Sequence, residues 1–246
     1  MMAGSSYSPP RESLSTLGNV VHLLQNATEV DGKPFHAHPA TYIAKLPGGE
    51  LYFQVPDMDI DDDGSSAGSP SGWVPFPLRG GKIDRVHQNE VAYATTPPIS
   101  PFQTPYIVLP GAKSSWWSKQ GVSKGDGVVI IRGTVRIDAV FADIGPDQKI
   151  GEMSVEAHRQ FNEDVIVAGK KPKLDGNGKP VVDTQTGKIV SEPALVTRNS
   201  GSKGPFIVIV FPHTSVKGKF VSVEQSLRPA IEQRFAALSA GPPVPN

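Results

Sequence analysis

Short apolar runs alternate along the chain with polar segments rich in glycine and proline, and this pattern predicts strands joined by turns. Residues 42–46 and 50–55 flank Pro47-Gly48-Gly49 and predict a hairpin, whose second strand runs directly into an acidic segment. Four further apolar runs have the length of strands: 106–109, 127–131, 134–142 and 206–211. The pattern therefore favours a β-rich domain.

Helical signals are fewer. Ser154 is a good N-cap residue with an acidic residue close behind, so we expect a short helix from there to about Phe161. Residues 14–27 show a weak helical period, and a second helix is expected over 223–238, interrupted or begun anew at Pro229. These helices are too few to build the core, and we expect them at the periphery.

Composition supports one domain with a mobile start and a polar insertion. The 246 residues include 25 glycines and 24 prolines, which is turn-rich composition suited to many short strands. Residues 1–13 are Ser/Pro-rich and are expected to be disordered. We predict a single mainly β (α+β) domain over 14–240, with a polar insertion at about 169–204 that carries a small surface hairpin at 181–190.

Charge and cysteine content exclude several classes of protein. The 24 basic and 24 acidic residues cancel, so no overall field draws the chain to nucleic acid or to a membrane, and we expect neither as partner. The absence of cysteine excludes disulfides and thiolate chemistry. The N-terminus lacks the basic start and apolar core of a secretory leader, so the localisation stays open between a missing leader and another export route.

An acidic segment is the first candidate for chemistry. Five aspartates lie between residues 57 and 63, and their mutual repulsion calls for solvent, a metal or a cationic substrate nearby. Asp59, Asp61 and Asp63, followed by glycine, match the first half of a calcium loop, but Pro70 stands where the bidentate Glu belongs. We therefore expect no EF-hand; an ion site of another kind and a solvated acidic loop remain as alternatives.

Asp143 and Glu152 form the second candidate. The strand ending near residue 142 delivers Asp143 to its end, and a turn containing glycine and proline then leads to Glu152. Cleavage of a glycosidic bond needs one carboxyl group to protonate the leaving oxygen and a second to act on water or on the sugar. The structural alternative is an Asp that caps a turn and a Glu at the start of a helix.

Three motifs in order give these acids a context: MDIDDDG (58–64), TPYIVLPG (104–111) and ADIGPDQKIGEMS (142–154). Together they resemble glycoside hydrolase family 75, the fungal-type chitosanases, over roughly residues 40–215. The resemblance implies an endo-acting hydrolase that cleaves β-1,4 bonds in chitosan with inversion, without cofactor or metal. It also implies a compact, barrel-like β domain related to the double-psi barrels, with peripheral helices.

The resemblance further assigns roles. Asp143 and Glu152 match the two essential carboxylates of the family; we assign Glu152 as general acid and Asp143 as general base, although the roles could be exchanged. A carboxylate-lined groove would favour a polycation such as chitosan. Tryptophans could stack on sugar rings, although packing in the core is their alternative role. The candidate substrate contacts are Asp59, Asp61, Asp63, Trp73 and Trp117.

The chain also departs from the family. Asp62 stands where a fungal member often has cysteine, and neither cysteine nor a leader is present. Two alternatives therefore stay open: a hydrolase of a bacterial cell-wall glycan, and a non-catalytic carbohydrate- or calcium-binding module. In each enzymatic case we expect a monomer whose partner is an amino-sugar polysaccharide.

Overall fold

The structure is a computed structural model of the full chain. It describes nine stretches of the chain: 27–29, 42–64, 67–73, 99–111, 117–145, 149–177, 179–198, 200–215 and 220–240. The predicted disordered segment 1–13, nearly all of the predicted helix 14–27 and the neighbouring Trp116 lie outside these residues.

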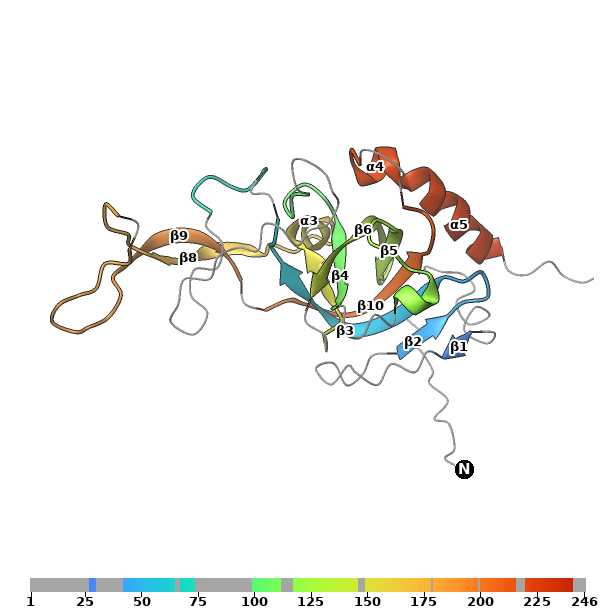
Figure 1. Ribbon diagram of the computed structural model, residues 1–246, viewed down its shortest axis with the longest axis horizontal. Coiled ribbons are helices and arrows are strands. Elements are labelled where there is room, and N and C mark those ends of the chain that lie inside the picture. The colour runs from blue at the N-terminus through green and yellow to red at the C-terminus, as the bar shows by residue number, and fades with distance from the viewer. Residues whose placement is uncertain are drawn as a thin grey trace, which may run out of the picture.

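Six strands close a β-barrel in the order β3-β10-β5-β6-β4-β7, with β7 pairing back onto β3 in parallel (Figure 1). The β4–β6 pair is also parallel, and the remaining neighbours in the barrel are antiparallel. The barrel strands are β3 (Leu51–Asp61), β4 (Tyr106–Pro110), β5 (Gly127–Arg132), β6 (Val135–Gly145), β7 (Glu152–Ser154) and β10 (Ser202–Phe211). Outside it, β2 (Tyr42–Lys45) and β1 (Thr28–Glu29) extend the sheet from the β3 side. The predicted mainly β, barrel-like fold with peripheral helices is confirmed; the finer double-psi topology stays a prediction.

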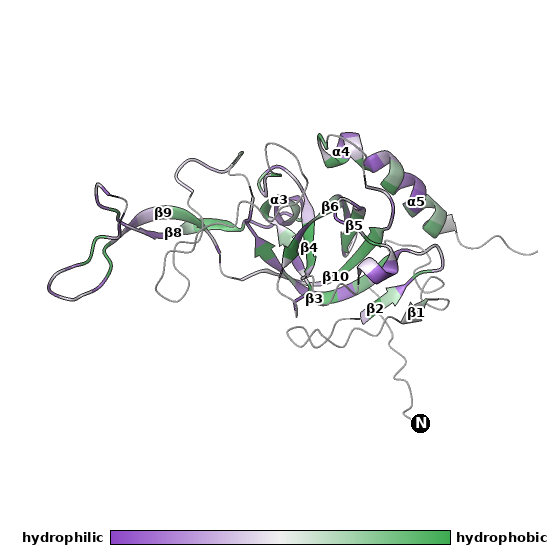
Figure 2. Cartoon of the chain, viewed as in Figure 1, coloured by the Kyte–Doolittle hydropathy of each residue, from purple (hydrophilic) through white to green (hydrophobic). Residues whose placement is uncertain are grey.

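Alternation along each strand builds the core. Side chains of β3 at Leu51, Phe53 and Val55 join one hydrophobic cluster that draws on all six barrel strands, whereas Tyr52 between them joins another. This alternation is what the two-residue period of a strand requires. Figure 2 shows the hydrophobic colour concentrated on the barrel strands. Burial of both faces explains why these strands appear in the sequence as continuous apolar runs.

The helices lie at the periphery, as predicted. Helix α3 (Val155–Gln160) starts at Ser154, whose hydroxyl accepts a hydrogen bond from the backbone N–H of Ala157. Helices α4 (Val223–Ser226) and α5 (Arg228–Ala240) are separated at Leu227, which confirms the interruption expected near Pro229. A short 3₁₀ helix, η1, spans Ser118–Gln120.

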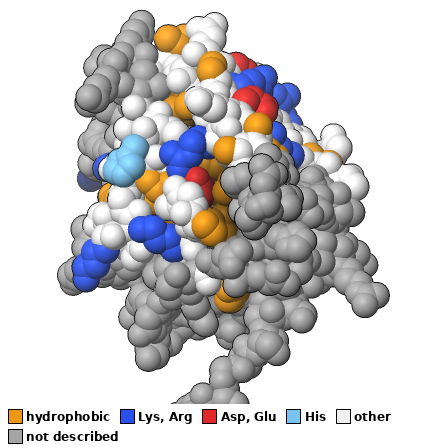
Figure 3. All heavy atoms as spheres, turned by 90° about the vertical axis from the view of Figure 1, so that its right-hand side faces the viewer, with side chains coloured by type: hydrophobic (Ala, Val, Ile, Leu, Met, Phe, Trp, Pro, Cys, Tyr) orange, Lys and Arg blue, Asp and Glu red, His pale blue; other side chains and the backbone are white. Residues whose placement is uncertain are grey.

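Helices α4 and α5 cover the second hydrophobic cluster, which also contains side chains of β5, β6 and β10. The end of the molecule that carries α5 is seen face-on in Figure 3, where basic side chains are scattered among neutral and hydrophobic ones. No described helix has the length and apolarity required to cross a bilayer.

The polar insertion forms an arm. Strands β8 (Ile166–Pro172) and β9 (Ser191–Thr197) pair antiparallel as a separate two-stranded sheet that extends away from the barrel (Figure 1). Beyond them the chain continues as a narrow loop, closed by an isolated bridge between Val182 and Ile189. The small hairpin predicted at 181–190 is therefore present as the tip of a longer arm.

Candidate functional site

The acidic segment is largely strand, not loop. β3 continues to Asp61, and its last three residues pair in parallel with β7, with Asp59 opposite Glu152 and Asp61 opposite Ser154. Because residues two apart on a strand point to the same side, Asp57, Asp59 and Asp61 share one face of the sheet. The interpretation of this segment as a solvated loop was therefore wrong up to Asp61.

Asp143 and Glu152 flank a single residue of β4. Val108 pairs with Asp143 on β6 at one side and with Glu152 on β7 at the other. Directly paired residues point to the same face of a sheet, so both acids are presented on the face of Val108. The turn expected between the two acids includes residues 146–148, which lie outside the described residues, and in the described part β4 lies between the two strands that carry the acids. With ~4.8 Å between strands, their Cα atoms are about 10 Å apart.

Two glycines position the Glu152 side chain. A Cβ atom at Gly145 would lie 2.7 Å from Oε2 of Glu152 and 2.9 Å from Cγ1 of Val108, so the absence of a side chain there leaves the space that the carboxylate occupies. Gly151 precedes Glu152 with φ +99°, a conformation that favours glycine. Its carbonyl accepts a hydrogen bond of 2.7 Å from the N–H of Asp59, which joins β7 to β3.

Lys149 connects two of the acids. Its Nζ lies 2.9 Å from Oδ2 of Asp59 and donates a short hydrogen bond to Oε1 of Glu152. The side chains of Lys149 and Glu152 are 24% and 14% exposed, so the pair is sheltered from solvent screening. Burial acts to lower the pKa of Lys149, but the carboxylates of Glu152 and Asp59 outweigh it and raise the pKa above its usual value.

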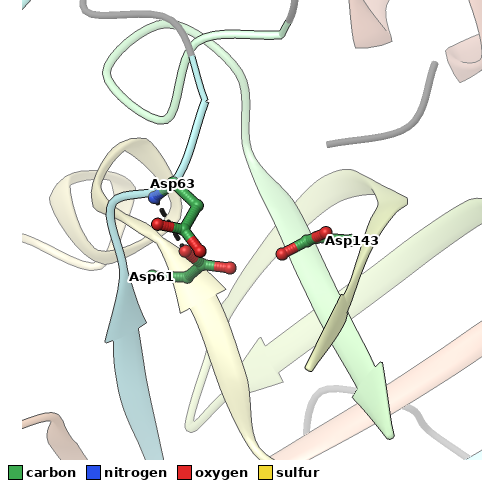
Figure 4. A group of neighbouring side chains, drawn as sticks. All are labelled: Asp61, Asp63 and Asp143. Atoms are coloured by element: carbon green, nitrogen blue, oxygen red, sulfur yellow. Dashed lines mark hydrogen bonds between the residues drawn. The ribbon is translucent and has the colours of Figure 1, made fainter. Parts of the chain in front are cut away.

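Three aspartates converge beside this pair (Figure 4). Carboxylate oxygens of Asp61, Asp63 and Asp143 lie within 4.8 Å of one another, from the end of β3, the segment after it and β6. The backbone N–H of Asp63 donates a 2.8 Å hydrogen bond to Oδ1 of Asp61. Asp143 is only 2% exposed and Asp61 9%. Carboxylates at this separation can share a proton or hold a divalent cation such as Ca²⁺.

The electrostatics favour a retained proton in this group. Burial, followed by repulsion from Asp63, Asp143 and Glu152, raises the pKa of Asp61 well above its ordinary value. Tyr106, which is fully buried, donates a hydrogen bond of 2.9 Å from its hydroxyl to the carbonyl of Asp63. Burial and the neighbouring aspartates raise its pKa as well, so the phenol stays neutral.

The two tryptophans predicted to contact substrate, Trp73 and Trp117, lie in different environments. Trp73 is half-buried, packs edge-on against Phe102 with 4.7 Å between ring centroids, and donates from Nε1 to the hydroxyl of Thr197 on β9. That hydroxyl in turn donates to Oδ2 of Asp62 at 2.7 Å. Trp73 therefore lies beside the acidic segment, at the base of the arm, and its sugar-binding role stays a prediction.

Trp117 belongs to the core. It is 9% exposed, packs edge-on against Phe141, and donates from Nε1 to the carbonyl of Pro110 at 2.8 Å. These contacts occupy the indole, so Trp117 fits the packing role that was its alternative and not a surface that stacks on a sugar.

A cavity of about 600 Å³ lies elsewhere on the molecule, and none of the predicted acids lines it. Its basic side chains are already engaged: Glu163 accepts hydrogen bonds from both Arg132 and Arg198, and Arg198 also donates to Ser202 and to two backbone carbonyls. These bonds tie the residues after α3 to the start of β10. We ascribe a structural role to this network, because none of the predicted acids of the candidate site lines the cavity.

No protein-family model matches the chain, and no curated protein matches it. The geometry brings together four predicted residues, namely Asp61, Asp63, Asp143 and Glu152, with Asp59 joined to them through Lys149.

Sequence reasoning missed Lys149, Tyr106 and Gly145. The parallel pairing of β7 with β3 brings Lys149 to Asp59, and no local pattern reports that pairing. Lys149 does lie three residues before Glu152, a spacing that alone could have suggested an ion pair.

Proposed function

We propose that the chain is a glycoside hydrolase that cleaves internal β-1,4 bonds of chitosan or a related amino-sugar polymer with inversion. The observation that carries the proposal is the pairing of Asp143 and Glu152 with opposite sides of Val108, which presents both acids on one face of the sheet. Inverting enzymes need a separation of roughly 6.5–9.5 Å between the two carboxyl groups, so that a water molecule fits with the sugar. Cα atoms about 10 Å apart, with side chains on one face, are compatible with that range.

The charge around the pair supports a cationic substrate. Asp59 has a side chain that is 37% exposed, against 14% for Glu152. A polymer at the site can therefore reach Asp59 beside Glu152. Carboxylates there favour the ammonium groups of glucosamine units over neutral sugars.

The proposal is tested on soluble chitosan of defined acetylation. Wild-type protein should release reducing ends, and Glu152→Gln should abolish the release while melting close to the wild type, since the substitution preserves the size of the side chain. Lys203→Met serves as a control, because Lys203 is 84% exposed and pairs with Asp57 away from the catalytic pair. Full activity in Glu152→Gln would refute the assignment. Digestion of purified bacterial sacculi in parallel separates a cell-wall glycan from chitosan as substrate.

One observation favours a second candidate, a divalent-cation or carbohydrate module without catalysis. The oxygens of Asp61, Asp63 and Asp143 lie within 4.8 Å of one another, which suits a hard cation with oxygen ligands. Calorimetric titration with calcium and with chitosan oligomers decides between the two functions. Binding without product formation, lost in Asp63→Asn, would support the module and contradict the hydrolase.

A further inference from the structure

Thr197 links the acidic segment to the base of the arm. It is the last residue of β9 and is only 5% exposed. Its hydroxyl accepts a hydrogen bond of 3.3 Å from Nε1 of Trp73 and donates one of 2.7 Å to Oδ2 of Asp62. A hydroxyl group has one hydrogen to donate and lone pairs that accept, so it can satisfy both partners at once. Thr197 therefore holds the indole beside the carboxylate.

Other contacts fix Trp73 at the same junction. It forms an isolated parallel bridge with Leu195 of β9, and the N–H of Leu195 donates to the carbonyl of Gly72 at 3.2 Å. The ring also packs against a small hydrophobic cluster. That cluster consists of Phe102, Val155 and Val165. The indole is thus held at its backbone, its ring and its N–H, which together favour one orientation of the side chain.

The exposed part of the Trp73 side chain is hydrocarbon. The residue is half-buried, and its one polar side-chain atom, Nε1, is directed to the buried hydroxyl of Thr197. Phe102 meets the indole edge-to-face, with 73° between the ring planes, and such a contact covers at most one face of the indole. Ser71 and Gly72, just before it, are exposed. An aromatic surface beside solvent suits the C–H face of a pyranose ring.

The neighbouring charges favour an amino sugar at this ring. Asp62, the second partner of Thr197, lies in the chain between Asp61 and Asp63, two members of the acidic group. The indole is therefore separated from that group by a single side chain. An ammonium group is attracted both by carboxylates and by the face of an aromatic ring, whereas a neutral sugar gains only the contact with the ring.

We propose that the base of the arm is a subsite that binds an amino-sugar unit of the polymer by stacking on Trp73, and that Thr197 is the positioning residue for this ring. The inference rests on the proposed function, since it names where the same polymer continues beyond the acidic site. It gives the arm a role in binding: β9 brings Thr197, 135 residues away from Asp62 in the chain, to the substrate.

The test separates the ring from its support. Thr197→Val has nearly the same shape without the hydroxyl, and Thr197→Ser keeps the hydroxyl. Thr186→Val is the matched control, because the Thr186 hydroxyl also donates to an aspartate, Asp183, at the exposed tip of the arm. In initial-rate measurements on chitosan, Thr197→Val and Trp73→Leu should raise KM by about three- to tenfold and leave kcat within about twofold. Thr197→Ser should restore the wild-type KM, and Thr186→Val should not change it.

Calorimetry measures binding without turnover. Chitosan oligomers are titrated into Glu152→Gln, alone and combined with Trp73→Leu or Thr197→Val, after melting curves show that each variant is folded. The affinity should fall in both combinations by the factor seen in KM. Equal affinities in all three proteins, no binding to Glu152→Gln, or an unchanged KM in both single variants would overturn the inference. If the oligomers bind through Trp73 but the wild type releases no product, the hydrolase function fails and the subsite stands.

Discussion

Replacing Asp61 by asparagine should make the protein more stable at neutral pH. Asp61 is 9% exposed, and its carboxylate lies within 4.8 Å of the oxygens of Asp63 and Asp143. Asparagine has nearly the same shape and keeps an oxygen that can accept the hydrogen bond from the N–H of Asp63. The substitution therefore removes a charge while leaving the packing and the turn in place.

The magnitude follows from Coulomb's law. Two unit charges 4.8 Å apart repel by about 3.5 kcal/mol at an effective dielectric constant of about 20. Native Asp61 avoids part of this repulsion by keeping a proton, and keeping that proton costs free energy at neutral pH. The gain in stability from Asp61→Asn should therefore be smaller than the full repulsion between two charges. We expect Asp61→Asn to raise the free energy of unfolding by about 2 kcal/mol at pH 7 to 8.

The pH dependence gives the sign of the effect. Burial and the neighbouring acids raise the pKa of Asp61 in the folded protein, so the folded state binds a proton more tightly than the unfolded chain. Wild-type stability is therefore lost as pH rises above the unfolded carboxyl pKa of about 3.9. The advantage of Asp61→Asn should vanish near pH 4 and grow as pH increases. Urea unfolding followed by circular dichroism at pH 4, 6 and 8 measures it.

Asp183→Asn provides the opposite control. The Asp183 carboxylate is exposed and accepts hydrogen bonds from the backbone of Thr186, the Thr186 hydroxyl and the backbone of Gln185, which lower its pKa. Its stabilising contribution is present above the unfolded pKa and is lost as pH falls through the folded one. Asp183→Asn should thus become less stable than wild type as pH rises.

A loss of stability in Asp61→Asn that is the same at pH 4 and pH 8 would refute the electrostatic reasoning.

Three further predictions follow from the same contacts. Gly145→Ala should lower kcat on chitosan by tenfold or more, measured by reducing-end release, because its methyl group would displace the Glu152 carboxylate; unchanged kcat would contradict this. Ser154→Ala should cost about 2–3 kcal/mol in urea unfolding, since it removes the cap of α3 and leaves the buried N–H of Tyr106 without its acceptor; a cost below about 0.5 kcal/mol would argue against it. Burial lowers the pKa of His158 to about 4, so wild-type stability should fall by about 3 kcal/mol as pH drops from 6.5 to 4. His158→Gln should not show that fall, and an equal fall in both proteins would exclude His158 as its source.

Local patterns were sufficient to predict most of the barrel. Apolar runs predicted β3, β4, β5, β6 and β10, whereas the short β7, with the sequence Glu-Met-Ser, has no such run. The cap at Ser154 and the break near Pro229 are chemical signals that can be recognised within a few residues. The arm could be predicted as a polar insertion, because most side chains of its strand β8 are exposed or only half-buried.

The order of the strands in the barrel could not be predicted from local sequence patterns. β4 inserts between β6 and β7, and β7 returns to β3, through pairings between residues far apart in the chain. Such pairings depend on closure of the whole barrel, so nothing in the local sequence indicated that β4 lies between the strands that carry Asp143 and Glu152. The same limit hid Lys149: its partner Asp59 is ninety residues away in sequence. Burial of Trp117 likewise depends on Phe141 and Pro110, which no local pattern connects to it.

The anomeric form of the first product tests the central claim most directly. Proton NMR of chitosan oligomers during the first minutes of reaction distinguishes the two anomers before mutarotation mixes them. Two acids on either side of Val108, about 10 Å apart at their Cα atoms, leave room for water between base and sugar, so the account predicts that the α-anomer appears first. Initial release of the β-anomer, or no release of any product by the folded protein, would contradict it.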